Sequence, residues 1–220
     1  MQLQTEAPAS TDLSTTESAT AADDVGRRML RQRRVMLTGA IDGPLAERVC
    51  TQLLVIEAEN PDLPITLYLH SPGGEVDAGF AIYDTMQSLS CEVATVCLGF
   101  AASMAQFLLC GGTTGRRTAH AHSRILMHQP LGSVSGYAVD IAIQAEQFTI
   151  MRRLMAELTA QHTGQTVERI LTDGERDRWF TPEEALEYGM IDQIIVRTKR
   201  SAAQPEGAVF AESSNGPESR

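Results

Sequence analysis

Short apolar runs alternate along this chain with longer segments of helical periodicity, and this alternation constrains the fold more than any other feature. Strands are predicted at residues 34–37, 65–69, 92–98, 123–127 and 191–196. Helices are predicted at residues 44–59, 77–89, 103–109, 137–162 and 182–188. Such an order is typical of α/β proteins, in which most strands pair in parallel.

Two of these helices have clear boundaries. The first has Pro44 in its opening turn, and its apolar residues recur on one face. The last begins with Thr181-Pro182-Glu183-Glu184, the pattern of a capping box, and ends at Gly189. Both helices are therefore predicted from local signals alone.

The length of 220 residues suits one domain with tails. Residues 1–26 and 198–220 are rich in small, polar and acidic residues, so they cannot bury enough apolar surface to offset the entropy of ordering. We expect the first segment to be disordered or removed as a propeptide, and the second to be a disordered tail. Residues 27–197 are expected to form the domain.

The net charge of −10 is concentrated in the tails, because residues 1–24 carry five acidic residues and no basic one. The nearly neutral domain gives no support for nucleic-acid binding. The four cysteines form no CxxC pair, which favours free thiols in a reducing compartment. No apolar run reaches the ~18–20 residues that span a bilayer, and no secretory signal is recognisable. We therefore expect a cytoplasmic protein without a membrane partner.

The segment from Gly99 to Ala105 places Ser103 among small residues, between a predicted strand and a predicted helix. A serine there is well placed as a nucleophile, because small neighbours let a substrate backbone approach and the first helical N–H groups are free. The alternative is that Ser103 only caps the helix. This segment alone does not decide between them.

A serine nucleophile needs a base, an acid that orients the base, and donors for the oxyanion. His128 and His70 each follow or end a predicted strand, and either could be the base, whereas His120 and His122 are expected in a polar loop. The pair Gly73-Gly74 is either a plain turn or a loop that presents a backbone N–H. Acidic residues are dense between residues 173 and 177, where a solvated turn is the simplest interpretation.

Several short motifs occur in a particular order from about residue 32 to residue 196. They include Ser71-Pro72-Gly73-Gly74, Ala101-Ala102-Ser103-Met104, Met127-His128-Gln129-Pro130, His162-Thr163-Gly164-Gln165 and Glu175-Arg176-Asp177-Arg178. In this order they resemble the ClpP family, the proteolytic subunits of ATP-dependent Clp serine proteases. The segment 131–136 is similar to that of the actinobacterial branch, in which several paralogues coexist.

The resemblance implies a role for each candidate residue. The family's nucleophile matches Ser103, its base matches His128 rather than His70, and its orienting acid matches Asp177. The oxyanion donors match the backbone N–H groups of Gly74 and Met104. The implied activity is hydrolysis of peptide bonds, which needs no metal and no organic cofactor.

The resemblance also implies an architecture. The fold is an α/β spiral of ββα units, of the type shared with crotonase-like enzymes, with a protruding handle made by helix 137–162 and a strand after Gln129. Two stacked seven-membered rings would enclose a chamber, into which an AAA+ unfoldase that consumes ATP feeds unfolded polypeptides. Glu175 and Arg176 match a charged pair that couples ring contact to the geometry of the triad, although a surface ion pair is the alternative.

The chain departs from the family in two places. The pocket that docks the unfoldase is usually aromatic; Tyr68 and the apolar Ile195 match it, but Ser88 and Thr118 stand where aromatic residues are expected. Aromatic anchors dominate interface energies, so we expect weak docking. Residues before Gln32 also lack the usual N-terminal pattern. Both departures fit a mixed complex in which a second ring docks the unfoldase.

Two other functions remain open from the sequence. One is a structural or regulatory ring subunit whose activity depends on a partner. The other is an enoyl-CoA hydratase or isomerase, since that superfamily shares the spiral and a glycine-based oxyanion loop. Such an enzyme has no need of a triad like Ser103, His128 and Asp177.

Overall fold

The computed structural model describes residues 24–130 and 136–196, and it confirms the α/β class. Residues 24–31 are helical, and they include three residues that the sequence analysis assigned to the N-terminal tail. The rest of that tail, the C-terminal tail from residue 198 and the strand expected after Gln129 lie outside the described residues.

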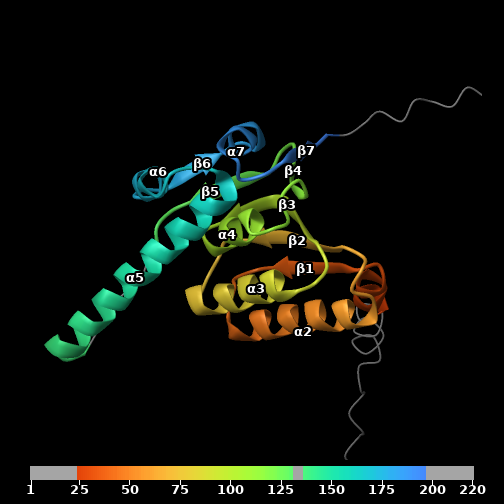
Figure 1. The fold of residues 1–220 in the computed structure, drawn as a ribbon, viewed down its shortest axis with the longest axis horizontal. Helices are drawn as coiled ribbons and strands as arrows, with labels where there is room; N and C mark the ends of the chain where they lie inside the picture. Colours follow the sequence, from red (N-terminus) through yellow and green to blue (C-terminus); the bar gives the residue numbers. More distant parts are fainter. Residues whose placement is uncertain (1–23, 131–135, 197–220) are drawn as a thin grey trace, which may run out of the picture.

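One mixed sheet forms the centre of the molecule (Figure 1). Its parallel strands are β1 (Arg34–Thr38), β2 (Ile65–Ser71), β3 (Val93–Ala102), β4 (Arg117–His120) and β7 (Gln193–Ile195), in this spatial order. β5 (Arg124–Met127) pairs in parallel with the second half of β3, and β6 (Arg178–Phe180) pairs antiparallel with β5. β3 is thus shared between β4 and β5, and the two last strands, β7 and β6, join the sheet through β4 and β5.

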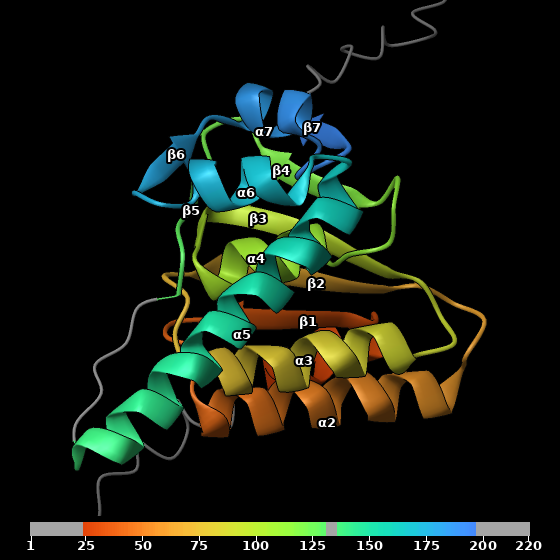
Figure 2. The ribbon, with the colours of Figure 1, turned by 60° about the vertical axis from the view of Figure 1, so that its left-hand side comes forward.

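Helices connect most of the consecutive strands. They are α2 (Gly43–Glu59), α3 (Val76–Ser88), α4 (Met104–Cys110), α5 (Ala138–Thr163), α6 (Val167–Asp173) and α7 (Pro182–Tyr188). α2 and α3 lie side by side along one face of the sheet in both ribbon views (Figures 1 and 2). The repeated passage from strand to helix to the next parallel strand gives the spiral path that was predicted.

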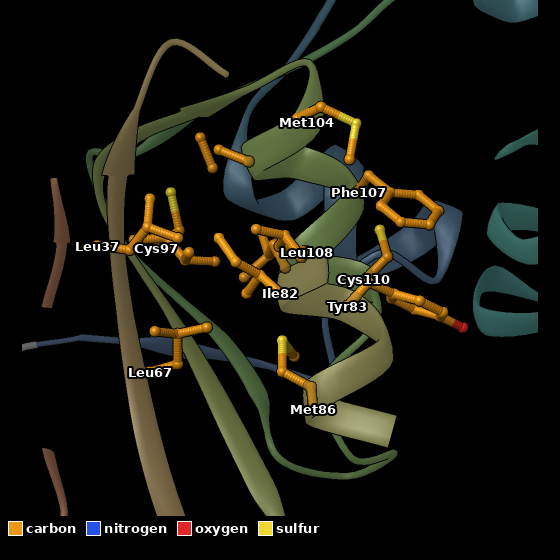
Figure 3. Close-up of a cluster of buried hydrophobic side chains, with 14 of the residues drawn as sticks. Leu37, Leu67, Ile82, Tyr83, Met86, Cys97, Met104, Phe107, Leu108 and Cys110 are labelled. Atoms are coloured by element: carbon orange, nitrogen blue, oxygen red, sulfur yellow. The ribbon is translucent and has the colours of Figure 1, made fainter. Parts of the chain in front are cut away.

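The core lies between the sheet and these helices, as the close-up in Figure 3 shows. Leu37 and Leu67 point from the strands toward Ile82 of α3, and Phe107 of α4 packs at the other side of the cluster. All four side chains are at most 1% exposed. Burying an aliphatic or aromatic side chain of this size contributes about 1.5–3 kcal/mol, so this cluster anchors α3 and α4 to the sheet.

The predicted boundaries of α2 and α7 are confirmed. Asp42 precedes α2 and accepts a hydrogen bond from the Leu45 N–H at 2.9 Å. The capping box of α7 is complete, because Thr181 and Glu184 each accept from the other's backbone N–H. Gly189 ends α7 with φ 88°, in the left-handed region that glycine adopts without steric cost.

Three short elements were missed by the sequence analysis: β4, α6 and β6. β4 contains Arg117 and His120, so its polar composition conceals it, and His120 lies in this strand rather than in the expected loop. β6 has only three residues and exists because β5 lies beside it. Elements this short depend on tertiary pairing more than on local propensity.

The long helix α5 leaves the body of the molecule, as Figures 1 and 2 show. Its buried residues are Ala156, Thr159, Ala160 and Thr163, all in its last third. The first half is largely exposed: Tyr137 at the N-cap and Val139 and Ile143 in the helix are 84%, 71% and 54% exposed. The expected protruding helix is therefore present. Among the described residues, none of the helices combines the length and the apolar character needed to cross a membrane.

Candidate active site

Ser103 occupies a sharp turn between β3 and α4. Its φ and ψ of 56° and −122° lie outside the regions that most non-glycine residues adopt. Its N–H donates to the Leu126 carbonyl at 2.9 Å, which ties the turn to β5. Ser103 occupies the N-cap position of α4, but its hydroxyl makes no capping bond to the helix, so capping does not explain the serine side chain. A backbone held in so rare a conformation suggests a functional constraint.

The loop after β2 lies directly against this turn. A Cβ added to Gly73 would be 2.7 Å from the Ala102 carbonyl oxygen and 2.7 Å from the Ser103 Cβ. A Cβ on Gly74 would be 2.1 Å from the Ile41 carbonyl oxygen. Because both positions have positive φ and no room for a side chain, the glycines allow a close approach that other residues would prevent.

Two backbone N–H groups are left free at this contact. Within residues 24–130 and 136–196, neither the Gly74 N–H nor the Met104 N–H donates a hydrogen bond. Ile41 holds the loop in place, since its N–H donates to Gly73 and its carbonyl accepts from Glu75, both at 2.8 Å. Free N–H groups in a fixed loop can stabilise an oxyanion.

His128 meets Asp177 because β5 and β6 pair side by side. In this antiparallel register Met127 lies opposite Arg178, so the next pair of positions is His128 and Asp177. The His128 Nδ1 lies 3.1 Å from the Asp177 Oδ1. A carboxylate only accepts, so Nδ1 carries the hydrogen and Nε2 is left to accept a proton. The two side chains are 17% and 66% exposed.

Ser103 and His128 line the same small cavity, of about 40 Å³. Most of its wall is apolar and comes from β5, α4, α5 and α6 (Met127, Phe107, Met155, Ala156, Ile170 and Leu171). In the described part of the chain, no hydrogen bond joins the Ser103 hydroxyl to His128. The two groups are therefore neighbours across a cavity rather than a bonded pair.

A polar network holds the segment that carries Asp177. Asp173 forms ion pairs with Arg178 and with Arg169, and it accepts from the Tyr188 hydroxyl at 2.8 Å. Burial and the hydrogen bond to Asp173 raise the pKa of Tyr188, so its hydroxyl stays protonated and donates. The loop between α6 and β6 is also tied to the strand end, because the Gln129 N–H donates to Gly174 at 2.7 Å.

His70 and His162 lie elsewhere in the fold and bond to other groups. His70 lies on β2, with its Nδ1 2.7 Å from the Leu98 carbonyl oxygen and its ring against Phe100. His162 lies in the last turn of α5, and its Nε2 lies 2.7 Å from the Tyr83 hydroxyl. Burial and the charge of Arg117 lower the pKa of His162. Neither His70 nor His162 lines the cavity beside Ser103.

Glu175 and Arg176 precede Asp177 on the same loop, and both are exposed. Neither forms a salt bridge with another residue of the described chain. The alternative of a surface ion pair within the chain is therefore not seen among the described residues. Both side chains are available to a neighbouring molecule.

The residues expected to form the docking pocket lie in two different places. Tyr68 and Thr118 are in one row across the sheet, each paired with Val96 of β3, and Ile195 lies opposite His120 on the adjacent strand. This row faces away from α3, because its neighbours Leu67 and Leu69 point into the core. Ser88 ends α3 and donates to the Thr85 carbonyl in its own helix.

One residue of the cavity was missed by the sequence analysis. Arg152 of α5 lines it together with Met155, Ala156 and Thr159. The spacing of these residues places them on one face of a helix, and a basic residue on that otherwise apolar face was the available signal. Among the described residues, no group of three or more histidine, cysteine or acidic side chains converges as a metal site.

Comparison with known proteins agrees with this geometry. A family model described as Clp protease matches residues 17–198. The chain belongs to the Clp protease family. It is 50% identical to the ATP-dependent Clp protease proteolytic subunit 2 of Rhodococcus jostii over 188 residues, which cover 86% of this chain and 96% of that protein.

Relatives named subunit 1 and relatives named subunit 2 are similarly close to this chain in sequence identity. The chain is 52% identical to the proteolytic subunit 1 of Corynebacterium jeikeium over 84% of this chain and 98% of that protein. It is 50% identical to the subunit 1 of Mycobacterium tuberculosis over 84% of this chain and 92% of that protein. The predicted resemblance and the Clp-type serine endopeptidase class are thus confirmed, and these findings favour the peptidase over an enoyl-CoA hydratase or isomerase.

Proposed function

We propose that this chain is the proteolytic subunit of an ATP-dependent protease, with Ser103 as nucleophile, His128 as base and Asp177 as orienting acid. The contact of 3.1 Å between His128 Nδ1 and Asp177 Oδ1 carries the proposal. It leaves Nε2 free on a histidine that lines the same cavity as Ser103. This is the arrangement that a serine nucleophile requires.

In the proposed reaction the Ser103 hydroxyl attacks a peptide carbonyl while His128 takes its proton. The N–H groups of Gly74 and Met104, which have no partner within the described residues, donate to the oxyanion. His128 then protonates the leaving amine, and water releases the acyl group from Ser103. These steps use side chains and backbone groups of this chain, while ATP is consumed by the partner unfoldase.

We further propose that the subunit works in two stacked seven-membered rings. The exposed apolar residues of α5 support this, because a helix of a soluble domain rarely leaves such residues without a partner (Tyr137, Val139, Ile143, Phe148, Ile150 and Leu154). Two stacked rings would enclose the sites and admit only unfolded polypeptides. Glu175 and Arg176 are proposed to meet the neighbouring subunit.

Activity is proposed to depend on this assembly, and in a mixed complex on a second ring. In the described chain the Ser103 hydroxyl has no hydrogen-bond partner, and Asp177 is 66% exposed. A contact that covers the loop of Asp177 would order both. This observation favours a subunit whose peptidase activity is regulated by contact with a partner, rather than a subunit that is inactive.

The AAA+ unfoldase is proposed to dock through the second ring, since the row of Tyr68 and Thr118 offers one aromatic side chain only. The four cysteines are all free, which suits the reducing cytoplasm as the place of action. Native mass spectrometry with and without a related ring would establish the composition of the complex.

The test of the catalytic assignment is Ser103→Ala. We expect this variant to lose cleavage of a fluorogenic peptide and labelling by a serine-directed phosphonate, because no other group supplies the nucleophile. Ser90→Ala is the matched control, since Ser90 is exposed and lies outside the cavity. Cleavage and labelling that persist in Ser103→Ala but not in a boiled sample would show the assignment to be wrong.

A further inference from the structure

Ser71 is a polar residue at an inward-facing position of β2. The inward-facing residues before it on this strand are Ile65, Leu67 and Leu69, and all four side chains are 0% exposed. A hydroxyl buried at such a position costs free energy unless it is hydrogen-bonded, whereas an apolar side chain would fill the position without that cost. Packing of the core therefore does not explain why a serine stands here.

The Ser71 hydroxyl is bonded to the loop that follows β2. Its Oγ accepts a hydrogen bond from the Gly73 N–H at 3.0 Å. Pro72 lies between the two residues and stiffens this contact, because a proline fixes its own φ and restricts the backbone of the residue before it. Among the described residues, no other side chain is hydrogen-bonded to the backbone of residues 72–75. Ser71 is thus the side chain that holds this loop.

The Gly74 N–H is free because the backbone groups on both sides of it are held. The Gly73 carbonyl accepts from the Ile41 N–H, and the Glu75 N–H donates to the Ile41 carbonyl, both at 2.8 Å. In a trans peptide the carbonyl and the N–H point in opposite directions, so the bond to Gly73 turns the Gly74 N–H away from Ile41. Since the Gly73 N–H is bound to Ser71, the loop offers the Gly74 N–H to an oxyanion.

The backbone of Gly73 also lies against the second proposed donor. A Cβ on Gly73 would be 2.9 Å from the Met104 nitrogen and 2.7 Å from the Ser103 Cβ. Ser71 itself pairs with β3 just before the turn that carries Ser103. A shift of Gly73 would therefore change the distance between the N–H groups of Gly74 and Met104, which must both point at one oxygen atom.

We propose that Ser71 is a positioning residue of the reaction, whose hydroxyl holds the Gly73 N–H and thereby fixes the Gly74 N–H where the oxyanion forms. This inference rests on the proposed function of Ser103. Without the hydroxyl, the Gly73 N–H loses its partner and the peptide group between Gly73 and Gly74 is free to rotate. The rate is then affected more than substrate binding, because the oxyanion exists in the transition state and not in the bound substrate.

Ser71→Ala removes the acceptor, and it is tested on full-length protein in the assembly that cleaves a fluorogenic peptide. We expect kcat to fall by at least about tenfold and KM to change by less than about twofold, as for an interaction made in the transition state. Inhibition by a peptide boronate should weaken in proportion to kcat, because its adduct with Ser103 places an oxygen where the oxyanion forms. A role confined to stability would leave both quantities unchanged in the folded variant.

The matched control is Ser123→Ala. Ser123 is 2% exposed, and its hydroxyl donates to the Cys97 carbonyl at 3.0 Å, so this variant loses a buried serine hydroxyl away from the oxyanion loop. We expect it to keep the kcat and the boronate inhibition of the wild type. Wild-type kcat in Ser71→Ala, a change in KM alone, or an equal loss of kcat in both variants would overturn the inference.

If Ser71→Ala does not fold, Ser71→Cys is measured in its place, because a thiol fills the position of the hydroxyl but accepts hydrogen bonds weakly. The same fall in kcat is expected, and an unchanged kcat would refute the inference. Failure of the proposed function is distinguishable, because Ser103→Ala would then keep cleavage and the phosphonate label. If this inference alone fails, Ser103→Ala is inactive and Ser71→Ala cleaves at the wild-type rate.

Discussion

Gly73→Ala tests whether the loop after β2 and the turn at Ser103 form one reacting centre. An added Cβ would lie 2.7 Å from the Ser103 Cβ and 2.9 Å from the Met104 nitrogen, whereas ordinary contacts of a Cβ begin at 3.4 Å. The loop and the turn must therefore separate by roughly 0.7 Å or more, because atoms cannot overlap at these distances. The neighbouring atoms are backbone or Cβ, so no flexible side chain can absorb the shift.

The expected effect on activity follows from this displacement. A misplacement of about 1 Å costs on the order of 10²-fold in rate, and losing one oxyanion donor costs about 10²–10³-fold. We therefore expect kcat/KM to fall by on the order of 10²-fold or more. The effect on stability is smaller, because an alanine forced into the left-handed region costs about 1–2 kcal/mol.

Gly39→Ala separates the two effects. Gly39 has φ +86°, nearly the same as the +89° of Gly73, but a Cβ there meets no atom within 4 Å. Both variants should lose the stability that the left-handed backbone costs an alanine, Gly73→Ala should lose more because its Cβ also displaces neighbouring atoms, and only Gly73→Ala should lose cleavage of a fluorogenic peptide. Equal kcat/KM for the two variants, with equal assembly, would refute the reasoning.

Two further predictions concern stability and assembly. Asp192→Asn leaves Arg117 with an uncompensated buried charge, because the wild-type pair has a bond of 2.6 Å and side chains only 5% and 17% exposed; unfolding in urea should show a loss of about 3–5 kcal/mol at pH 7. Burial alone would raise the pKa of Asp192, but hydrogen bonds from Arg117 and Gly115 hold this pKa below its ordinary value. The free energy that the ion pair contributes to folding is therefore fully present above about pH 4. It is lost as the pH falls through the pKa of Asp192 in the folded protein. The variant should therefore show a flatter dependence on pH in that window. Arg176→Glu should lower both ring assembly, measured by native mass spectrometry, and peptide cleavage; unchanged activity would count against the coupling of ring contact to the triad.

Local signals predicted much of this fold. The capping box at Thr181, the proline at the start of α2 and the glycine that ends α7 act within a few residues of the chain, so their effects are present in the sequence itself. The apolar runs of β1 to β3 and the long helix α5 were likewise found within a few residues of their observed bounds.

The candidate site was predicted through motifs rather than through local physics. The residues next to Ser103 in the sequence did not decide between a helix cap and a nucleophile. In the same way, the residues next to His70 and His128 did not decide which of them is the base. Only contacts with residues distant in the sequence distinguish these alternatives. His70 proved to lie on the side of β2 away from the core, which no signal near His70 reveals.

The amino-acid sequence by itself therefore determined the α/β class, most helix boundaries and the residues available for chemistry. Only the tertiary structure decided that β5 and β6 pair in the register that brings His128 to Asp177, that Gly73 lies against Ser103, and that Arg152 lines the cavity with no hydrogen-bond partner for its Nε among the described residues. Register and packing are sums over contacts between residues far apart in the chain. Hydrophobic periodicity and capping motifs depend only on residues close together in the sequence, so they do not predict contacts between distant residues.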